Sequence, residues 1–231
     1  MARIAILDLT TVAPELADLD PAGTTIRNWL AQGLPAGEIV VVPVADGERL
    51  PDVADHDAYV ISGSEKGVYD DAPWMSATRQ FLLSARDNGK PLFGICFGHQ
   101  LMADTFGGKA ELSGHGMRIG PERFGFGGRS LEAHVWHQDQ VTRVPPDAQI
   151  VGQAGYCPAF VLQYAFKAAS VQFHPELGRD YFNACIERLS GSHIEPESAA
   201  SAARAVALGN VAGDLFVREA VEVLSGGRLL P

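Results

Sequence analysis

The stretch KPLFGICFGHQLMADTFGG, residues 90–108, joins an apolar segment to a segment of helical character, with Cys96 at the junction. Residues 91–95 have the continuous apolar character of a strand buried on both faces. Gly94 and Gly98 flank the thiol and permit a tight, strained turn between this strand and the helix that follows. The pattern therefore predicts a thiol exposed at the carboxyl end of a sheet strand.

The same alternation of strand and helix runs through the first half of the chain. Apolar strands are predicted at residues 3–9, 38–44, 56–64, 91–95 and 167–173, and helices at 24–32, 74–89, 99–107 and after 174. This order predicts an α/β fold with a mostly parallel sheet flanked by helices. Short β-like segments with many glycines fill residues 109–166, and they predict a small antiparallel β element in the second half.

The C-terminal part of the chain has a different composition. Residues 1–190 are predicted to form one domain, and residues 191–231 a linker followed by a helical extension. The segment 201–225 is alanine-rich, with apolar residues at the spacing of one or two amphipathic helices. We expect this extension to pack on the domain or on a second copy of the chain, as a homodimer.

Composition excludes several classes of protein. The formal charge of −10 argues against a nucleic-acid surface, which requires clustered Lys and Arg. Residues 1–10 lack the apolar core of a signal peptide, and no later run is long enough to span a bilayer, so a cytoplasmic protein without a membrane partner is expected. Three cysteines imply no disulfide framework, and the absence of metal-type spacing predicts neither metal nor cofactor.

A base for the Cys96 thiol is predicted at the end of another strand. In VQFHPE, residues 171–176, His174 can take the thiol proton and Glu176 can fix its tautomer. The carboxyl ends of strands in an open α/β sheet converge on one crevice, so Cys96 and His174 are expected to meet there.

The chemistry also requires two N–H groups that face the developing oxyanion. The Phe97 N–H, directly after the nucleophile, is one candidate. The corner Ser62-Gly63-Ser64, which ends the strand at 56–64, is the second.

Together GICFGHQ, the upstream SGS corner and VQFHPE resemble the class I glutamine amidotransferases, Cys-His-Glu enzymes that release ammonia from glutamine. The resemblance covers residues 3–190 in order and implies a flavodoxin-like fold. It implies Cys96 as nucleophile, His174 as base, Glu176 as its orienting group, and oxyanion N–H groups at Ser64 and Phe97. No cofactor is implied.

The resemblance also implies a site for the glutamyl end of a small-molecule substrate. Gln100 lies one helical turn past Cys96, with Gly63 beside the nucleophile, and the remaining contacts come from the backbone around Trp136, His137, Gln138 and Asp139. His99 is expected to be structural, and His137 to shape the loop.

Two departures from the family pattern leave the substrate open. The upstream corner reads Ser-Gly-Ser-Glu where synthetase-linked members have Gly-Gly-Pro, and Trp136 replaces a small polar residue. No nucleotide loop follows Ser190, so ammonia would go to a separate synthetase subunit or be released. Three readings follow: hydrolysis of glutamine through a γ-glutamyl thioester, hydrolysis of a larger γ-glutamyl peptide or amide, and a catalytically silent binding protein on the same fold.

Overall fold

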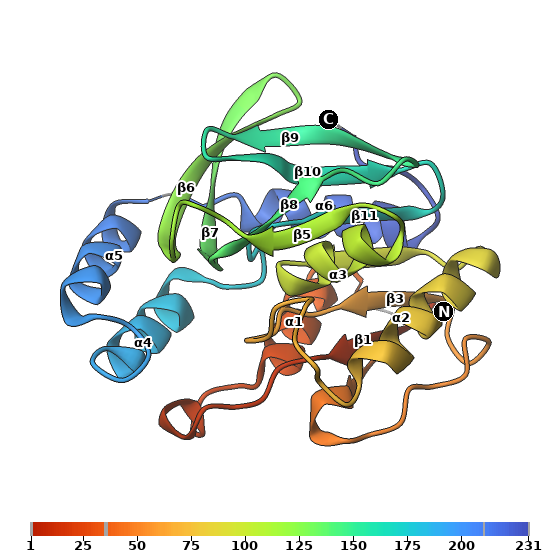
Figure 1. Ribbon diagram of the computed structural model, residues 1–231, viewed down its shortest axis with the longest axis horizontal. Helices are drawn as coiled ribbons and strands as arrows, with labels where there is room; N and C mark the ends of the chain where they lie inside the picture. Colours follow the sequence, from red (N-terminus) through yellow and green to blue (C-terminus); the bar gives the residue numbers. More distant parts are fainter. Residues whose placement is uncertain (1, 35–36, 210, 231) are drawn as a thin grey trace.

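The main sheet of the computed structural model, which describes residues 2–34, 37–209 and 211–230, has nine strands in the order β2-β1-β3-β4-β11-β10-β9-β6-β7 (Figure 1). The first five are parallel and correspond to the five predicted strands: β2 (Glu38–Pro43), β1 (Arg3–Asp8), β3 (Ala58–Ile61), β4 (Leu92–Ile95) and β11 (Ala168–Val171). The predicted α/β fold is confirmed.

The second half of the sheet is antiparallel and is larger than the sequence suggested. It consists of β10 (Cys157–Tyr164), β9 (Ala148–Ala154), β6 (Arg118–Phe126) and β7 (Arg129–His137). Gly127 and Gly128, both with positive φ, form the two-residue turn between β6 and β7. The predicted small antiparallel element is present as a separate sheet of β5 (Lys109–Leu112) and β8 (Asp139–Arg143).

Helices cover both faces of the parallel half, which explains why its strands are apolar throughout. Side chains alternate along β1, so that Ile4 and Ile6 pack with α1 (Ala22–Ala31) and α6 (Gly213–Leu224). Ala5 and Leu7 point to the other face, where α2 (Met75–Asp87) and α3 (Phe97–Thr105) lie. The carboxyl ends of β1, β3, β4 and β11 therefore reach the same edge of the sheet.

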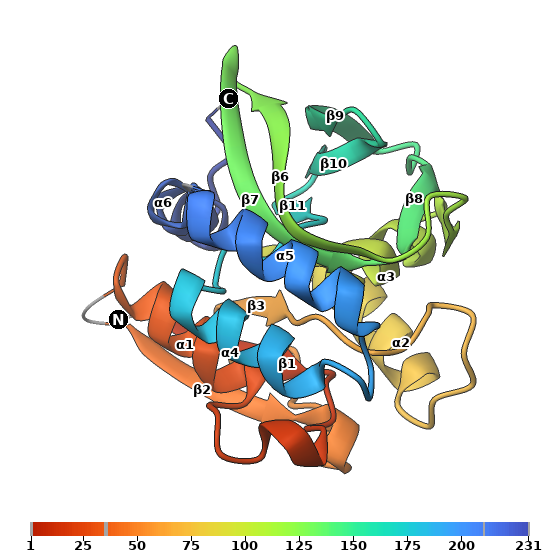
Figure 2. The ribbon, with the colours of Figure 1, turned by 90° about the vertical axis from the view of Figure 1, so that its left-hand side faces the viewer.

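Two further helices lie side by side (Figure 2), at the left-hand end of the molecule in Figure 1. α4 (Arg179–Leu189) packs against α5 (Pro196–Leu208), and α5 contacts β6. Short 3₁₀ turns at η1 (Pro14–Leu16) and η2 (Val44–Asp46) follow β1 and β2. Leu16 of η1 packs into the apolar cluster formed by α4 and α5, so the segment after β1 is held against α4.

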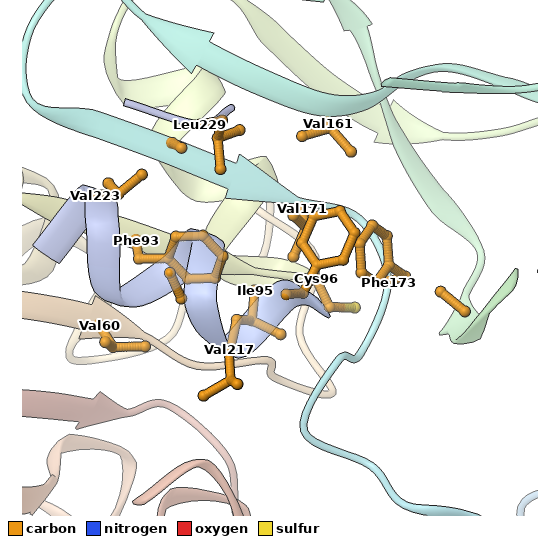
Figure 3. Packing of buried hydrophobic residues seen from close by; sticks show 14 of the residues in the cluster. Val60, Phe93, Ile95, Cys96, Val161, Val171, Phe173, Val217, Val223 and Leu229 are labelled. Atoms are coloured by element: carbon orange, nitrogen blue, oxygen red, sulfur yellow. The ribbon is translucent and has the colours of Figure 1, made fainter. Parts of the chain in front are cut away.

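The tail predicted to be helical forms two helices, α5 and α6, and α6 packs on the sheet. Phe216 is fully buried, 4.8 Å from the Phe173 ring. Figure 3 shows Val217 and Val223 close to Phe93 in the same cluster. The predicted division at residue 190 stays a prediction, although α6 shares its core with the strands.

Candidate active site

Cys96 occupies the corner between β4 and α3 with a backbone conformation that only a constrained turn imposes. Its φ is 52° and its ψ −102°, and no other non-glycine residue in the described ranges has a positive φ. Such a conformation costs about 1–3 kcal/mol and persists where the surroundings fix it. The Cys96 N–H donates to the Val171 carbonyl at 2.8 Å, which ties the corner to β11.

Both glycines of the elbow are required by close packing. A Cβ on Gly98 would lie 2.3 Å from the Ile61 carbonyl oxygen, and a Cβ on Gly94 would lie 2.7 Å from the Met102 sulfur. Real Cβ atoms do not approach other atoms this closely, so a larger residue would push α3 away from β3 and β4. The glycines beside Cys96 therefore serve the turn, as the sequence predicted.

His174 and Glu176 lie together beside the thiol. His174 Nδ1 lies 2.7 Å from Glu176 Oε1, and both side chains are largely buried. This contact places the Nδ1 proton on the side of the carboxylate and leaves Nε2 for the thiol. The His174 N–H donates to the His134 carbonyl at 2.8 Å, so the backbone of this loop is also fixed.

The charge state of His174 depends on its two partners. Burial lowers the pKa of the imidazole, but the charges of Glu176 and Cys96 and hydrogen bonds to both side chains outweigh this effect. The pKa of His174 is therefore raised well above its ordinary value.

Gln172 is a contact of the nucleophile that the sequence analysis missed. Its Nε2 lies 3.8 Å from Cys96 Sγ, and its Oε1 accepts a hydrogen bond from Gln100 at 3.2 Å. Gln172 directly follows β11 and precedes His174 by two residues, the spacing that in a strand places two side chains on one face. The alternation in VQFHPE was therefore the signal for this residue.

The two residues predicted to donate to the oxyanion are Phe97, next to Cys96 in the chain, and Ser64, which follows β3. The Phe97 N–H is the first of α3 and has no partner within the helix. In the corner after β3, a Cβ on Gly63 would lie 3.2 Å from His174 Cε1 and 3.9 Å from the Cys96 Cβ. Ser64 follows and lines the same cavity as Cys96.

Ser62 fixes this corner in place, and the sequence analysis assigned it no separate role. Its hydroxyl accepts the Leu9 N–H and donates to the Gly63 carbonyl, each at 2.8 Å. Its carbonyl accepts the Gly98 N–H at 3.0 Å. The β3 corner is thereby attached both to β1 and to the elbow.

The β7–β8 loop, which is Gln138 together with the ends of the two strands beside it, also lines the cavity. Gln100 Nε2 donates to the Asp139 carbonyl at 2.9 Å, so Gln100 holds this loop as well as lining the cavity. His137 contacts the Asp139 carbonyl and the Tyr156 hydroxyl, each at 2.9 Å. Burial lowers the pKa of His137 to about 4, so it is neutral at neutral pH, and its two contacts join the β7–β8 loop to Tyr156.

His99 lies outside the cavity lining. Its Nδ1 lies 2.8 Å from the Ser170 hydroxyl, and burial lowers its pKa to about 3. A buried, neutral and hydrogen-bonded histidine agrees with the structural role expected from the sequence.

A single cavity of about 650 Å³ brings the predicted residues together. Those that line it are Gly63, Ser64, Cys96, Gln100, Trp136, His137, Gln138, Asp139, His174 and Glu176. Phe97 does not line the cavity, because its ring is buried against Trp74 and only its backbone is expected at the site. The cavity continues between α4 and residues 10–22, a part that the sequence analysis did not predict.

Comparison with known proteins shows the family to which the chain belongs. The family model "Glutamine amidotransferase class-I" matches residues 22–184, and the chain therefore belongs to the class I glutamine amidotransferase family. A crystal structure of a glutamine amidotransferase from Thermotoga maritima superposes with a TM-score of 0.74 at 19% identity, covering 96% of this chain and 97% of that one. At that identity the likeness shows the fold alone.

Two curated relatives differ in their named activities. Gamma-glutamyl peptidase 4 of Arabidopsis thaliana is 29% identical over 170 residues, 66% of this chain and 67% of its own length. A subunit of the glutamine-hydrolysing GMP synthase of Pyrococcus furiosus is 36% identical over 107 residues, 42% of this chain and 57% of its own length.

Within the described ranges, no helix is both long and apolar enough to cross a membrane.

Proposed function

We propose that the protein hydrolyses γ-glutamyl amides, glutamine being the simplest, through a γ-glutamyl thioester on Cys96. The observation that carries the proposal is that Cys96 and His174 line the same cavity, with atoms of both within 4 Å of the position that a Cβ on Gly63 would take, while His174 Nδ1 lies 2.7 Å from Glu176. This is the arrangement of nucleophile, base and orienting group that activated thiols require.

The reaction follows from these positions. His174 takes the Cys96 proton, and the thiolate attacks the γ-carbonyl carbon of the substrate. The negative oxygen of the tetrahedral intermediate accepts hydrogen bonds from the N–H groups of Phe97 and Ser64. His174 returns its proton to the leaving nitrogen as the C–N bond breaks, and ammonia or an amine departs. Water, deprotonated by His174, then cleaves the thioester to release glutamate.

The glutamyl end is assigned to the wall made by Gln100 and the β7–β8 loop. Gln100, Gln138 and Asp139 offer amide and carboxylate groups, and Trp136 and His137 shape the surface between them. Burial raises the pKa of Asp139, whose carboxylate also accepts the Tyr69 hydroxyl at 3.2 Å. A carboxylate at this position suits the α-amino group of the substrate.

The second candidate function is hydrolysis of γ-glutamyl peptides or amides that have a larger leaving group than ammonia, and two observations support it. The cavity volume of about 650 Å³ exceeds what glutamine needs, and one relative is named a gamma-glutamyl peptidase. A silent binding protein on this fold is the third candidate, and the close His174–Glu176 contact weighs against it.

The fate of released ammonia is part of the same proposal. One relative is named as a subunit of GMP synthase, which supports transfer to a separate synthetase subunit over simple release. The homodimer stays a prediction. A cytoplasmic location is proposed, since the Cys96 thiol must remain reduced to react.

The test is release of glutamate from glutamine and from γ-glutamyl dipeptides by the wild type, Cys96→Ser and Cys157→Ala. Cys157 is a buried thiol outside the cavity and serves as the matched control. Cys96→Ser should release no glutamate, and Cys157→Ala should retain the wild-type rate. Full activity in Cys96→Ser would refute the thiol mechanism, and silence of the wild type on every substrate would favour the binding protein.

A further inference from the structure

The part of the cavity beyond His174 is lined by Leu177, which precedes α4, and by a stripe of side chains on α4. Leu177, Tyr181, Cys185 and Leu189 recur at intervals of four residues, and all four line the cavity. Residues at this spacing lie on one face of a helix. Apart from the tyrosine hydroxyl and the thiol, the face is hydrocarbon.

The opposite wall is the segment between β1 and α1. Val12, Ala13, Pro14 and Leu16 line the cavity there and present a second apolar surface. Val12 is 46% exposed, so the cavity leaves part of this surface open to solvent. The two walls thus form an apolar cleft that continues from Cys96, and the polar residues Thr10, Thr11, Asp20, Glu65, Lys66 and His193 line the rest of the cavity around it.

Polar contacts hold the two walls at a fixed separation. The Tyr181 hydroxyl donates to the Asp20 carbonyl at 2.6 Å, and His193 Nε2 lies 3.6 Å from Glu15 Oε1. Arg188 pairs with Asp18 in the same region. Leu16 packs in the cluster of α4 and α5. The cleft is therefore a built feature of the fold.

The position of His174 decides which part of a substrate faces this cleft. The leaving nitrogen must take its proton from His174, so the leaving group lies on the His174 side of the scissile bond. From His174 the chain runs through Leu177 directly into α4. The glutamyl half is assigned to the other side, at Gln100 and the β7–β8 loop.

We propose that the cleft between α4 and residues 12–16 binds the leaving group, and that the substrates are γ-glutamyl amides of apolar amines. This inference rests on the proposed function and specifies its substrate. Ammonia would leave both apolar walls in contact with water, whereas an alkyl or arylalkyl amine would bury them. A site of about 650 Å³ also falls in the range of cavities that hold small molecules.

The test compares kcat/KM for glutamine with that for γ-glutamyl ethylamide, butylamide, phenethylamide and 3-hydroxypropylamide. Each buried methylene should raise kcat/KM about fourfold, so the butylamide should exceed glutamine by on the order of a hundredfold. The 3-hydroxypropylamide matches the butylamide in length and should lose most of that gain, because its hydroxyl is desolvated.

Val12→Asp tests the cleft itself, with Leu208→Asp as the matched control. Both side chains are exposed, and Leu208, 89% exposed on α5, lies outside the cavity. Val12→Asp should lower the butylamide-to-glutamine ratio of kcat/KM by about tenfold or more, because the carboxylate must be desolvated against hydrocarbon. Leu208→Asp should leave the ratio unchanged.

The outcomes separate the two proposals. Glutamate release from all amides at equal kcat/KM, or fastest from glutamine, would overturn the apolar cleft and leave γ-glutamyl hydrolysis standing. An unchanged ratio in Val12→Asp would also overturn it. No glutamate from any amide would reject the proposed function and the inference together.

Discussion

Glu176→Gln tests whether the charge of the carboxylate, and not only its shape, activates His174. Glutamine has the same size, and its carbonyl oxygen can still accept the Nδ1 proton of His174 at the 2.7 Å contact. The substitution therefore keeps the orientation of the imidazole and removes the negative charge. Glu176 itself is almost fully buried, so solvent does not screen this interaction.

The expected fall in kcat/KM for Glu176→Gln follows from the strength of a hydrogen bond to a charged group. Such a bond contributes about 1.5–3 kcal/mol, and the charged form of His174 is the one that Glu176 stabilises. If the transition state loses this free energy, kcat/KM for a γ-glutamyl amide should fall by about 10- to 150-fold. The expected fall lies well below that of Cys96→Ser, because the nucleophile and oxyanion donors remain.

The pH dependence of kcat/KM is a second, independent measure of what Glu176→Gln removes. Burial lowers the pKa of His174, and Glu176 contributes the largest opposing effect, together with Cys96. The protonated His174 should persist to higher pH than an ordinary histidine and then be lost. In Glu176→Gln the alkaline limb of kcat/KM should move to lower pH, because the charge that raised the pKa is absent.

The assay is glutamate release across the pH range, with Glu111→Gln as control. Glu111 is a partly exposed carboxylate on β5, paired with Lys109 outside the cavity, and its removal should leave rate and profile unchanged. A fall in kcat/KM of less than about threefold for Glu176→Gln, with an unmoved alkaline limb, would refute the electrostatic role.

Further predictions concern the core, the elbow and the other thiols. Phe216→Ala should lower the free energy of unfolding by about 3–5 kcal/mol in a denaturant titration, because the ring is fully buried on α6. Gly98→Ala should abolish glutamate release, since its Cβ would meet the Ile61 carbonyl; wild-type activity would contradict the packing argument. Cys157 and Cys185 should stay unmodified by iodoacetamide at neutral pH in peptide mass mapping, because burial raises their pKa values to about 12 and about 11. Rapid alkylation of either would contradict this.

Local patterns were enough to predict the parallel half of the fold. The strands β1, β2, β3, β4 and β11 are buried on both faces, so their apolar runs are continuous and easy to recognise. The elbow was equally visible, because Gly94 and Gly98 can be read from spacing alone. These features depend on residues that are neighbours in sequence.

The parts that were missed depend on contacts between distant segments. Strands β6, β7 and β9 are partly exposed, β6 is interrupted by two glycines and a proline, and each of these strands and β10 pairs with a neighbour in the antiparallel half, so their length and their place in the main sheet do not follow from local pattern. The apolar cleft needs α4 and residues 12–16 together, about 170 positions apart. Gln172 was missed because its partner, Cys96, lies 76 residues away at the end of another strand.

The position of α6 against the sheet has a consequence for folding while the chain is being synthesised. Phe216 and its neighbours cover β4 and β11, yet they leave the ribosome after every strand of the main sheet. Until residue 224 has emerged, the nascent sheet exposes one apolar face, including Phe93 and Ile95. Such surface attracts chaperones and other nascent chains. The Trp29 indole, which donates to the Gly213 carbonyl at 3.2 Å, joins α1, made before most of the strands, to the helix that completes the core.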